Sequence, residues 1–323
     1  MKVRGQNLQA RRHWLQAGFF LLFVLAPVLD LFRYDLTLGH FILLGRPWTL
    51  GLDALIAGTI TPLQALVNVV VRGFLPLLLV AGTLLLVAWR YGRLYCGWLC
   101  PHFSVVERIN RYMQRACGKP SLWEPGPLPA RQPDGRVLRT NPLYWLAAVG
   151  AAAGFALLWA VTLLTYLLPP VEIWQNLLTA SLTPNQARFI GVVTLLLFID
   201  FMFARHLFCR YGCAVGLFQS LAWMGNRHAM VVGFEGKRAR DCHACNAACD
   251  NACPMRLKPR SIKRKMFTCT ECAQCVEACA MVQANNPKGG LLQWVDGADA
   301  LPVVNGRRAR HYSPGRVIAT EPR

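Results

Sequence analysis

The chain has 323 residues, of which 54% are hydrophobic and only 16% are charged, and its formal net charge is +19. This composition is too apolar for an ordinary soluble protein and fits a membrane protein with a polar segment. The basic residues lie mostly between and after hydrophobic runs, so membrane orientation explains them better than nucleic-acid binding, which we exclude.

Four segments are long and apolar enough to cross a bilayer, which takes about 20 residues. They cover about residues 14–32, 65–89, 143–168 and 188–205. No small-residue cleavage site follows the first apolar run, which favours a retained anchor over a cleaved signal peptide. The apolar stretch 41–60 is broken by glycine, proline and aspartate, and we interpret it as a re-entrant or interfacial piece.

Three charged residues fall inside or near these spans: Asp30, Arg72 and Asp200. Ionisable groups in a membrane are costly and are often functional. Asp30 and Arg72 share the outer half of the predicted topology, and a structural ion pair between them is favoured over a proton or quinol site. Asp200 lies near the inner end of the fourth span and is expected to reach the interface.

Two similar cysteine pairs follow the second and fourth spans. They are Cys96 and Cys100 in RLYCGWLCP, and Cys209 and Cys213 in RHLFCRYGCA, a weak internal repeat. On a helix, positions i and i+4 share one face, so each pair would offer two sulfurs to one site. We predict that the two pairs form a four-thiolate metal site for copper, as Cu(I), or for a further iron–sulfur cluster. A dithiol–disulfide couple is the remaining alternative.

Lysine and arginine are concentrated at the N-terminus, in the loop between the second and third spans, and from Arg205 onward, whereas residues 169–187 contain none. By the positive-inside rule, both termini and all cysteines face the cytoplasm. That side of the membrane is reducing, which favours thiolate ligands over structural disulfides.

The densest cysteine segment runs from Cys242 to Cys279. Its second motif (Cys269, Cys272, Cys275 and Cys279) has the C-x2-C-x2-C-x3-C spacing of a cubane iron–sulfur site. Its first motif (Cys242, Cys245, Cys249 and Cys253) has one extra residue between the second and third cysteines. In such pairs of motifs the fourth cysteine usually reaches across to the other cluster. Zinc and disulfides are the alternatives, but an unbroken run of four cysteines favours two [4Fe-4S] clusters.

The predicted fold is therefore a mainly α membrane protein. Residues 1–224 form a membrane domain with four transmembrane helices and both C-x3-C motifs. Residues 225–295 form a cytoplasmic two-cluster ferredoxin-like domain, and residues 296–323 form a C-terminal tail.

These motifs resemble the membrane-bound 4Fe-4S polyferredoxins of the NapH, NosR and CcoG (FixG/RdxA) kind. The likeness rests on CGWLCP at 96–101, CRYGC at 209–213 and the 242–279 block, and covers roughly residues 14–295. The passages FCRYGCAVGLFQS and ECAQCVEACAMVQANNPKGGLLQW are most similar to the CcoG-like branch, but the chain lacks that branch's fifth span and C-terminal periplasmic domain. Its second pair also lacks a following proline.

The resemblance implies a multi-pass protein of the bacterial inner membrane that transfers electrons between a quinol or cytoplasmic donor and a respiratory partner. The alternative is a copper reductase or assembly factor for a haem–copper (cbb3-type) oxidase, acting through the C-x3-C thiols. The expected partners are the membrane, respiratory electron-transfer proteins or such an oxidase, and quinol. No Walker loop, nucleotide fingerprint or Ser/His/Asp arrangement is present, so we predict no catalytic residues.

Overall fold

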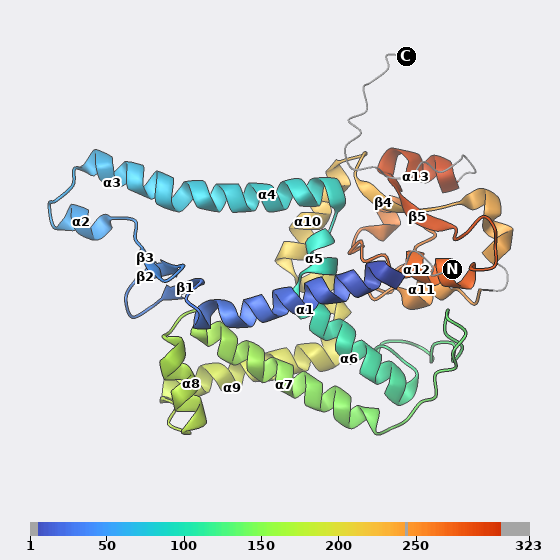
Figure 1. The fold of residues 1–323 in the computed structure, drawn as a ribbon, viewed down its shortest axis with the longest axis horizontal. Coiled ribbons are helices and arrows are strands. Elements are labelled where there is room, and N and C mark those ends of the chain that lie inside the picture. Colours follow the sequence, from blue (N-terminus) through green and yellow to red (C-terminus); the bar gives the residue numbers. More distant parts are fainter. Residues whose placement is uncertain (1–5, 243–244, 305–323) are drawn as a thin grey trace, which may run out of the picture.

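The computed structural model describes residues 6–242 and 245–304, and this part of the chain is mainly helical (Figure 1). Its α-helices are α1 (Gln6–Val28), α2 (Leu52–Ile56), α3 (Pro62–Val69), α4 (Leu75–Tyr91), α5 (Leu94–Trp98), α6 (Pro101–Cys117), α7 (Tyr144–Thr165), α8 (Pro170–Leu178), α9 (Pro184–Ile199), α10 (Ala214–Gly225), α11 (Ala248–Ala252), α12 (Gln274–Val282) and α13 (Gly297–Val304). The strands are β1 (Phe32–Asp35), β2 (His40–Leu43), β3 (Arg46–Trp48), β4 (Met230–Phe234) and β5 (Leu292–Asp296). The π-helical turns are η1 (Val70–Phe74), η2 (Asp200–Ala204) and η3 (Phe208–Gly212), and the 3-10 turns are η4 (Gly236–Cys242) and η5 (Lys263–Met266).

Three helical stretches of the described chain are long and apolar enough to cross a membrane: Pro62–Tyr91, Tyr144–Thr165 and Pro184–Ala204. They coincide with the second, third and fourth predicted spans. The first predicted span, 14–32, is not among them. Helix α1 ends at Val28, and its first half is polar and basic, so its apolar run is short.

The helices α3 and α9 begin in the same way, and both open a membrane-spanning stretch. Thr61 and Thr183 are their N-caps, each accepts a hydrogen bond from the backbone N–H of a glutamine three residues later, and each is followed by a proline. This capping box with proline in the first turn fixes where a helix starts. The two starts read TPLQA and TPNQA, so the internal repeat extends beyond the cysteine pairs.

The spans differ in how they are packed. Helix α7 packs against α6 and α9, and Ala148, Ala152, Ala156 and Ala160 are fully buried along one of its faces. Small side chains at i, i+4 spacing let neighbouring helices approach closely. The apolar stretch of α3–α4, in contrast, is exposed, and the helix lies apart from that bundle and contacts α10 near its C-terminal end (Figure 1).

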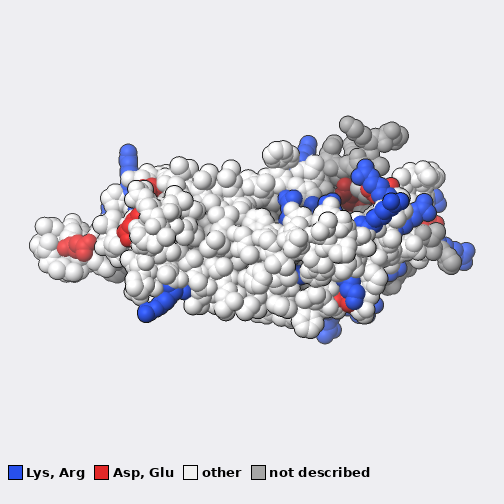
Figure 2. Space-filling view, turned by 90° about the horizontal axis from the view of Figure 1, so that it is seen from below, with Lys and Arg blue, Asp and Glu red and all other residues white. Residues whose placement is uncertain are grey.

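Charge is distributed unevenly on the face shown in Figure 2. Lysine and arginine gather over the end that holds the C-terminal segment, while the broad middle of this face carries few charged residues. An uncharged belt with a basic end is the pattern expected of a protein that sits in a membrane.

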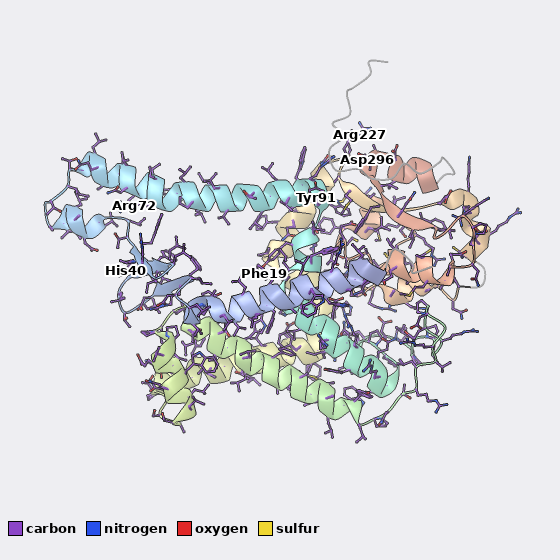
Figure 3. The ribbon with its side chains drawn as sticks, in the orientation of Figure 1. Phe19, His40, Arg72, Tyr91, Arg227 and Asp296 are labelled. Atoms are coloured by element: carbon purple, nitrogen blue, oxygen red, sulfur yellow. The ribbon has the colours of Figure 1, made fainter. Side chains whose placement is uncertain are left out.

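The segment between α1 and α3 does not span. It forms the antiparallel sheet β1-β2-β3 followed by the short α2. The predicted pair between Asp30 and Arg72 is wrong, because Arg33, only three residues from Asp30, binds both Asp30 and Asp35. Arg72 instead lies in η1 (Figure 3), and its Nη1 is 3.4 Å from the carbonyl oxygen of Thr49.

The C-terminal segment is built around the antiparallel pair of β4 and β5, with α11 and α12 between them in the sequence. We call this segment, from β4 to β5, the ferredoxin block. Helix α13 packs on β4 and β5, although it falls in the predicted C-terminal tail. The remainder of that tail, 305–323, lies outside the described residues.

Candidate metal centres

Four cysteines line a small pocket of the ferredoxin block, which we call pocket I. They are Cys242, Cys245 and Cys249 of the first motif and Cys279 of the second. The rest of the lining consists of Arg260, Gln283 and apolar side chains, among them Phe234 and Leu292. The pocket therefore draws three thiols from one motif and one from the other.

A second pocket, pocket II, has the complementary set. It is lined by Cys269, Cys272 and Cys275 of the second motif and Cys253 of the first. Its other walls are largely apolar and include Val232, Met255, Leu257 and Met266. The two sets have the crossed arrangement that the spacing of the motifs indicates.

Cys253 and Cys279, the last cysteine of each motif, each line the pocket of the other motif, and each accepts a hydrogen bond from a backbone N–H. The backbone N–H of Leu257 lies 3.4 Å from Cys253 Sγ, and that of Leu291 lies 3.2 Å from Cys279 Sγ. Donors aimed at sulfur stabilise thiolate and tune a cluster bound to it. Burial raises the pKa of Cys253 and of Cys249 to about 12. Such thiols stay protonated until a metal displaces the proton, so these donor sets fit iron–sulfur clusters.

The extra residue of the first motif does not move Cys245 out of pocket I. Both Asn246 and Ala247 adopt left-handed backbone conformations just before α11. In the second motif, Ala273 alone takes this conformation between Cys272 and α12. The additional residue is therefore absorbed in the turn before the helix.

The two C-x3-C pairs come together in the structure, and we call these four cysteines the quartet. Cys213 contributes to the raised pKa values of Cys96 and Cys100, and all three contribute to that of Cys209, although burial is the largest cause for each thiol. The ionised form of each of these three thiols is thus disfavoured further by its neighbours in the quartet. The quartet lies where α4 and η2 end.

The predicted i, i+4 placement of each pair on one continuous helix is wrong. Cys96 lies in α5 and Cys209 in η3, but both of these turns end before the second cysteine. Cys100 and Cys213 are instead the N-caps of α6 and α10, with extended ψ values of 118° and 108°. Pro101 explains the first break, since proline starts a helix but disfavours helical backbone before it.

Polar side chains surround the quartet. Arg93 is 1% exposed, and its Nε and Nη1 donate to Ser220 Oγ (2.6 Å) and to the carbonyl oxygen of Cys209 (2.8 Å). His102 lies 2.6 Å from Asp200 through Nε2 and 3.6 Å from Cys209 Sγ through Nδ1. Asp200, expected to reach the interface, is thus tied to the quartet.

The quartet is also joined to pocket II. A Cβ atom on Gly97 would lie 2.1 Å from the carbonyl oxygen of Thr270, so only glycine allows this contact between the two cysteine loops. Trp98 Nε1 donates to the carbonyl oxygen of Glu271 at 3.1 Å. Cys100 and Cys209 pack against the core that contains Cys253 and Cys269.

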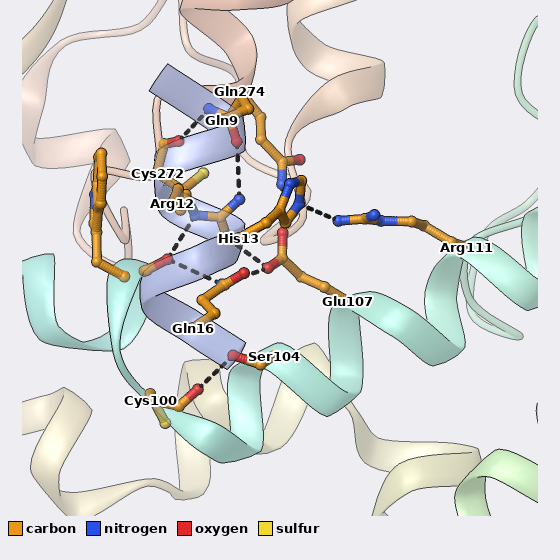
Figure 4. A network of polar contacts seen from close by, with 12 residues as sticks. Gln9, Arg12, His13, Gln16, Cys100, Ser104, Glu107, Arg111, Cys272 and Gln274 are labelled. Atoms are coloured by element: carbon orange, nitrogen blue, oxygen red, sulfur yellow. Dashed lines mark hydrogen bonds and ion pairs between the residues drawn. The ribbon is translucent and has the colours of Figure 1, made fainter. Parts of the chain in front are cut away.

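A buried polar network fixes α1 to both loops (Figure 4). Arg12 is fully buried, forms an ion pair with Glu107 of α6 and donates through Nε to the carbonyl oxygen of Gly97 at 2.6 Å. Gln9 donates to the carbonyl oxygen of Cys272 at 2.8 Å, and Gln274 donates to Glu107. The first turns of α1 are therefore packed against both candidate metal-binding loops.

Sequence reasoning did not assign roles to Arg93, Arg12 or Asp200 at these sites. The available signal for Arg93 was its position three residues before Cys96, matched by His206 before Cys209. Burial of an arginine inside the protein cannot be read from that spacing.

Comparison with known proteins supports iron–sulfur binding. A family model described as a 4Fe-4S binding domain (Fer4_5) matches residues 73–120 and 185–229, which contain the two C-x3-C pairs. The chain is 27% identical over 232 residues to YccM of Escherichia coli K12, which is named as a candidate electron transport protein. That match covers 68% of this chain and 59% of YccM.

A second relative is the uncharacterized protein MJ0750 of Methanocaldococcus jannaschii, which is 26% identical over 189 residues, covering 58% of this chain and 69% of that protein. No solved structure matches. The family model supports binding of a 4Fe-4S cluster, and neither comparison selects the NapH, NosR or CcoG branch.

Proposed function

We propose that this protein is a membrane-anchored iron–sulfur protein that transfers electrons between a quinol or cytoplasmic donor and a respiratory partner. The observation that carries the proposal is the crossed sharing of the eight block cysteines between pockets I and II. When bound, a [4Fe-4S] cluster supplies one-electron transfer.

The residues of the block hold and shield these groups. Cys242, Cys245, Cys249 and Cys279 are the proposed ligands in pocket I, and Cys253, Cys269, Cys272 and Cys275 are those in pocket II. The largely apolar walls of pocket II surround its thiols with side chains of low polarity. Arg260 in pocket I supplies positive charge next to its thiolates, which favours the more negative reduced state.

We further propose that α1 is a fourth membrane helix whose polar start is held against the block. Gln9, Arg12 and Gln16 are buried there, while Leu21 and Leu22 further along the helix are exposed. The distribution of lysine and arginine supports a topology with both termini and all cysteines on the cytoplasmic side.

Metal analysis of the full chain, purified without oxygen, tests this function. At least about eight iron and eight acid-labile sulfide per chain are expected for two cubane clusters. Zinc without sulfide would contradict the proposal. Copper bound with little iron would favour the copper-reductase alternative instead.

A further inference from the structure

We propose that a cleft between α6, the loop that follows it and the ferredoxin block binds a reduced flavin nucleotide, which gives one electron to each of the two clusters of the block. This role rests on the proposed function, because it names the class of the cytoplasmic donor and the place where that donor binds. The two clusters are those proposed for pockets I and II.

The cleft is large enough for an organic molecule. Its volume is about 520 Å³, within the range of about 300–1,000 Å³ that small-molecule sites occupy. One wall consists mainly of α6 and of residues 120–135 in the loop after it, and the other consists of residues 245–256 and one side of α12. The cleft therefore separates the helix that follows the first quartet pair from the block.

The cleft shares wall residues with both pockets of the block. Cys245, Ala248 and Val282 line the cleft and also pocket I. Cys253 lines the cleft and also pocket II. A molecule in the cleft is thus separated from each proposed cluster by a single layer of residues, which includes one proposed ligand of each. This position suits a donor that reduces both clusters.

The charged side chains of the cleft favour an anion. Three of the five that line it form ion pairs: Glu107 with Arg12, Asp134 with Arg136, and Arg256 with Glu124. The other two are Arg111 and Arg131, and neither forms an ion pair with a residue that the structure describes. Arg111 Nη2 lies instead 2.6 Å from Nε2 of His13 (Figure 4). Two guanidinium groups without a carboxylate partner favour a phosphate, whose oxygens match their donors.

The cleft also has apolar surfaces that fit a flat ring. Pro129 and Pro133 line it on the loop side, and Pro254 and Met281 line it on the block side. Apolar walls with a few polar groups are typical of sites that bind organic molecules. Together with the two arginines, these walls fit a ring compound that carries a phosphate.

The chemistry of the block selects a flavin among such compounds. A [4Fe-4S] cluster accepts one electron, whereas a nicotinamide nucleotide delivers a hydride, which carries two electrons at once. Reduced flavin mononucleotide releases its two electrons one at a time. It gives one electron to each cluster, becomes oxidised flavin and loses two protons to water, so electrons and protons balance.

Binding of flavin mononucleotide (FMN) to the full chain, purified without oxygen, tests the site. FMN fluorescence should be quenched saturably, and Arg111→Gln and Arg131→Gln should each weaken binding by about tenfold, because each removes a charged donor. Arg108→Gln and Arg139→Gln are the matched controls, since these arginines are exposed on the same helix and loop and are not among the lining residues. Equal weakening in controls and lining variants would overturn the site.

Two further probes separate the ring from the phosphate. Riboflavin, which lacks the phosphate, should bind more weakly than FMN, and inorganic phosphate at equal concentration should not displace FMN. Displacement by phosphate together with no binding of riboflavin would mean a site for anions only and would overturn the flavin.

Photoreduced FMN gives the second readout, the reduction of the clusters in electron paramagnetic resonance (EPR) spectra. Each flavin oxidised should yield about two reduced clusters, and Arg131→Gln should slow this reduction. Clusters that dithionite reduces but FMN does not would overturn the flavin site and leave the proposed function intact. No cluster signal even with dithionite would contradict the proposed function itself.

Discussion

The ferredoxin block and the quartet bring cysteines together by different routes. In the block, two motifs adjacent in the sequence fold around β4 and β5, and local spacing largely determines which thiols meet. In the quartet, the pairs belong to two separate helix repeats, and their meeting depends on how α4, η2 and α10 are arranged.

This difference shows what sequence spacing can predict. A short motif fixes its own loop, so the ligand set of a local site follows from the sequence. A site assembled from distant repeats follows only once helix packing is known. The two regions touch at Gly97 and Thr270, where the loop of the first quartet pair contacts the loop of the second block motif.

The largest effect is expected from breaking one pocket of the block. Cys279→Ser and Cys249→Ser should remove the same cluster, although they belong to different motifs, because both line pocket I. Cys253→Ser should remove the other cluster. EPR spectra of the reduced variants check this, and loss of one common signal in Cys253→Ser and Cys249→Ser would contradict the crossed arrangement.

Arg12→Gln should weaken the buried network that joins α1 to the quartet loop and to the block. Removing one partner of a buried ion pair typically costs about 3–5 kcal/mol, because Glu107 is left charged and unpaired. Thermal unfolding in detergent should show a clearly lower midpoint. Arg11→Gln is the matched control, since Arg11 is the exposed neighbour on the same helix; an equal loss in both would argue against the network.

His206 is buried and lies three residues before Cys209, and it predicts a pH dependence of stability. Burial lowers its pKa from 6.5 to about 4, so the folded protein favours the neutral ring. The associated stability is complete above about pH 6.5 and is lost as pH falls toward 4, by up to about 3 kcal/mol. His206→Gln should flatten the fall in unfolding midpoint over this window, whereas the same change at the less buried His40 should not.

The smallest effect concerns the two helix starts of the repeat. Thr61→Ala and Thr183→Ala should each lower stability by about 1 kcal/mol, because each removes the side chain that caps its helix. Equal small shifts in the unfolding midpoint would support the equivalence of the two repeats. Thr59→Ala serves as a control outside the caps.

Much of the fold could be predicted from apolar runs, but its exceptions have physical reasons. The first predicted span, 14–32, overlaps α1, but this helix starts earlier and ends at Val28, and its Arg12 is buried against Glu107. Asp30 pairs with Arg33 because the start of β1 holds them close, which an argument from membrane depth cannot foresee.

For the candidate sites too, part could be predicted from the sequence and part could not. The block cysteines and the quartet were identified from spacing and from the internal repeat. The sequence did not predict that the helix is interrupted at Cys100 and at Cys213, because two cysteines at i, i+4 also fit one continuous helix. Arg93 was missed because its importance comes from burial and from an unsatisfied N–H.

A redox titration of the full chain, followed by EPR under anaerobic conditions, tests the central claim most directly. An iron–sulfur electron carrier should develop signals of reduced [4Fe-4S] clusters, each with one-electron behaviour, and these signals should depend on the cysteines of pockets I and II. Bound metal that shows no change of oxidation state across the titration would contradict the account.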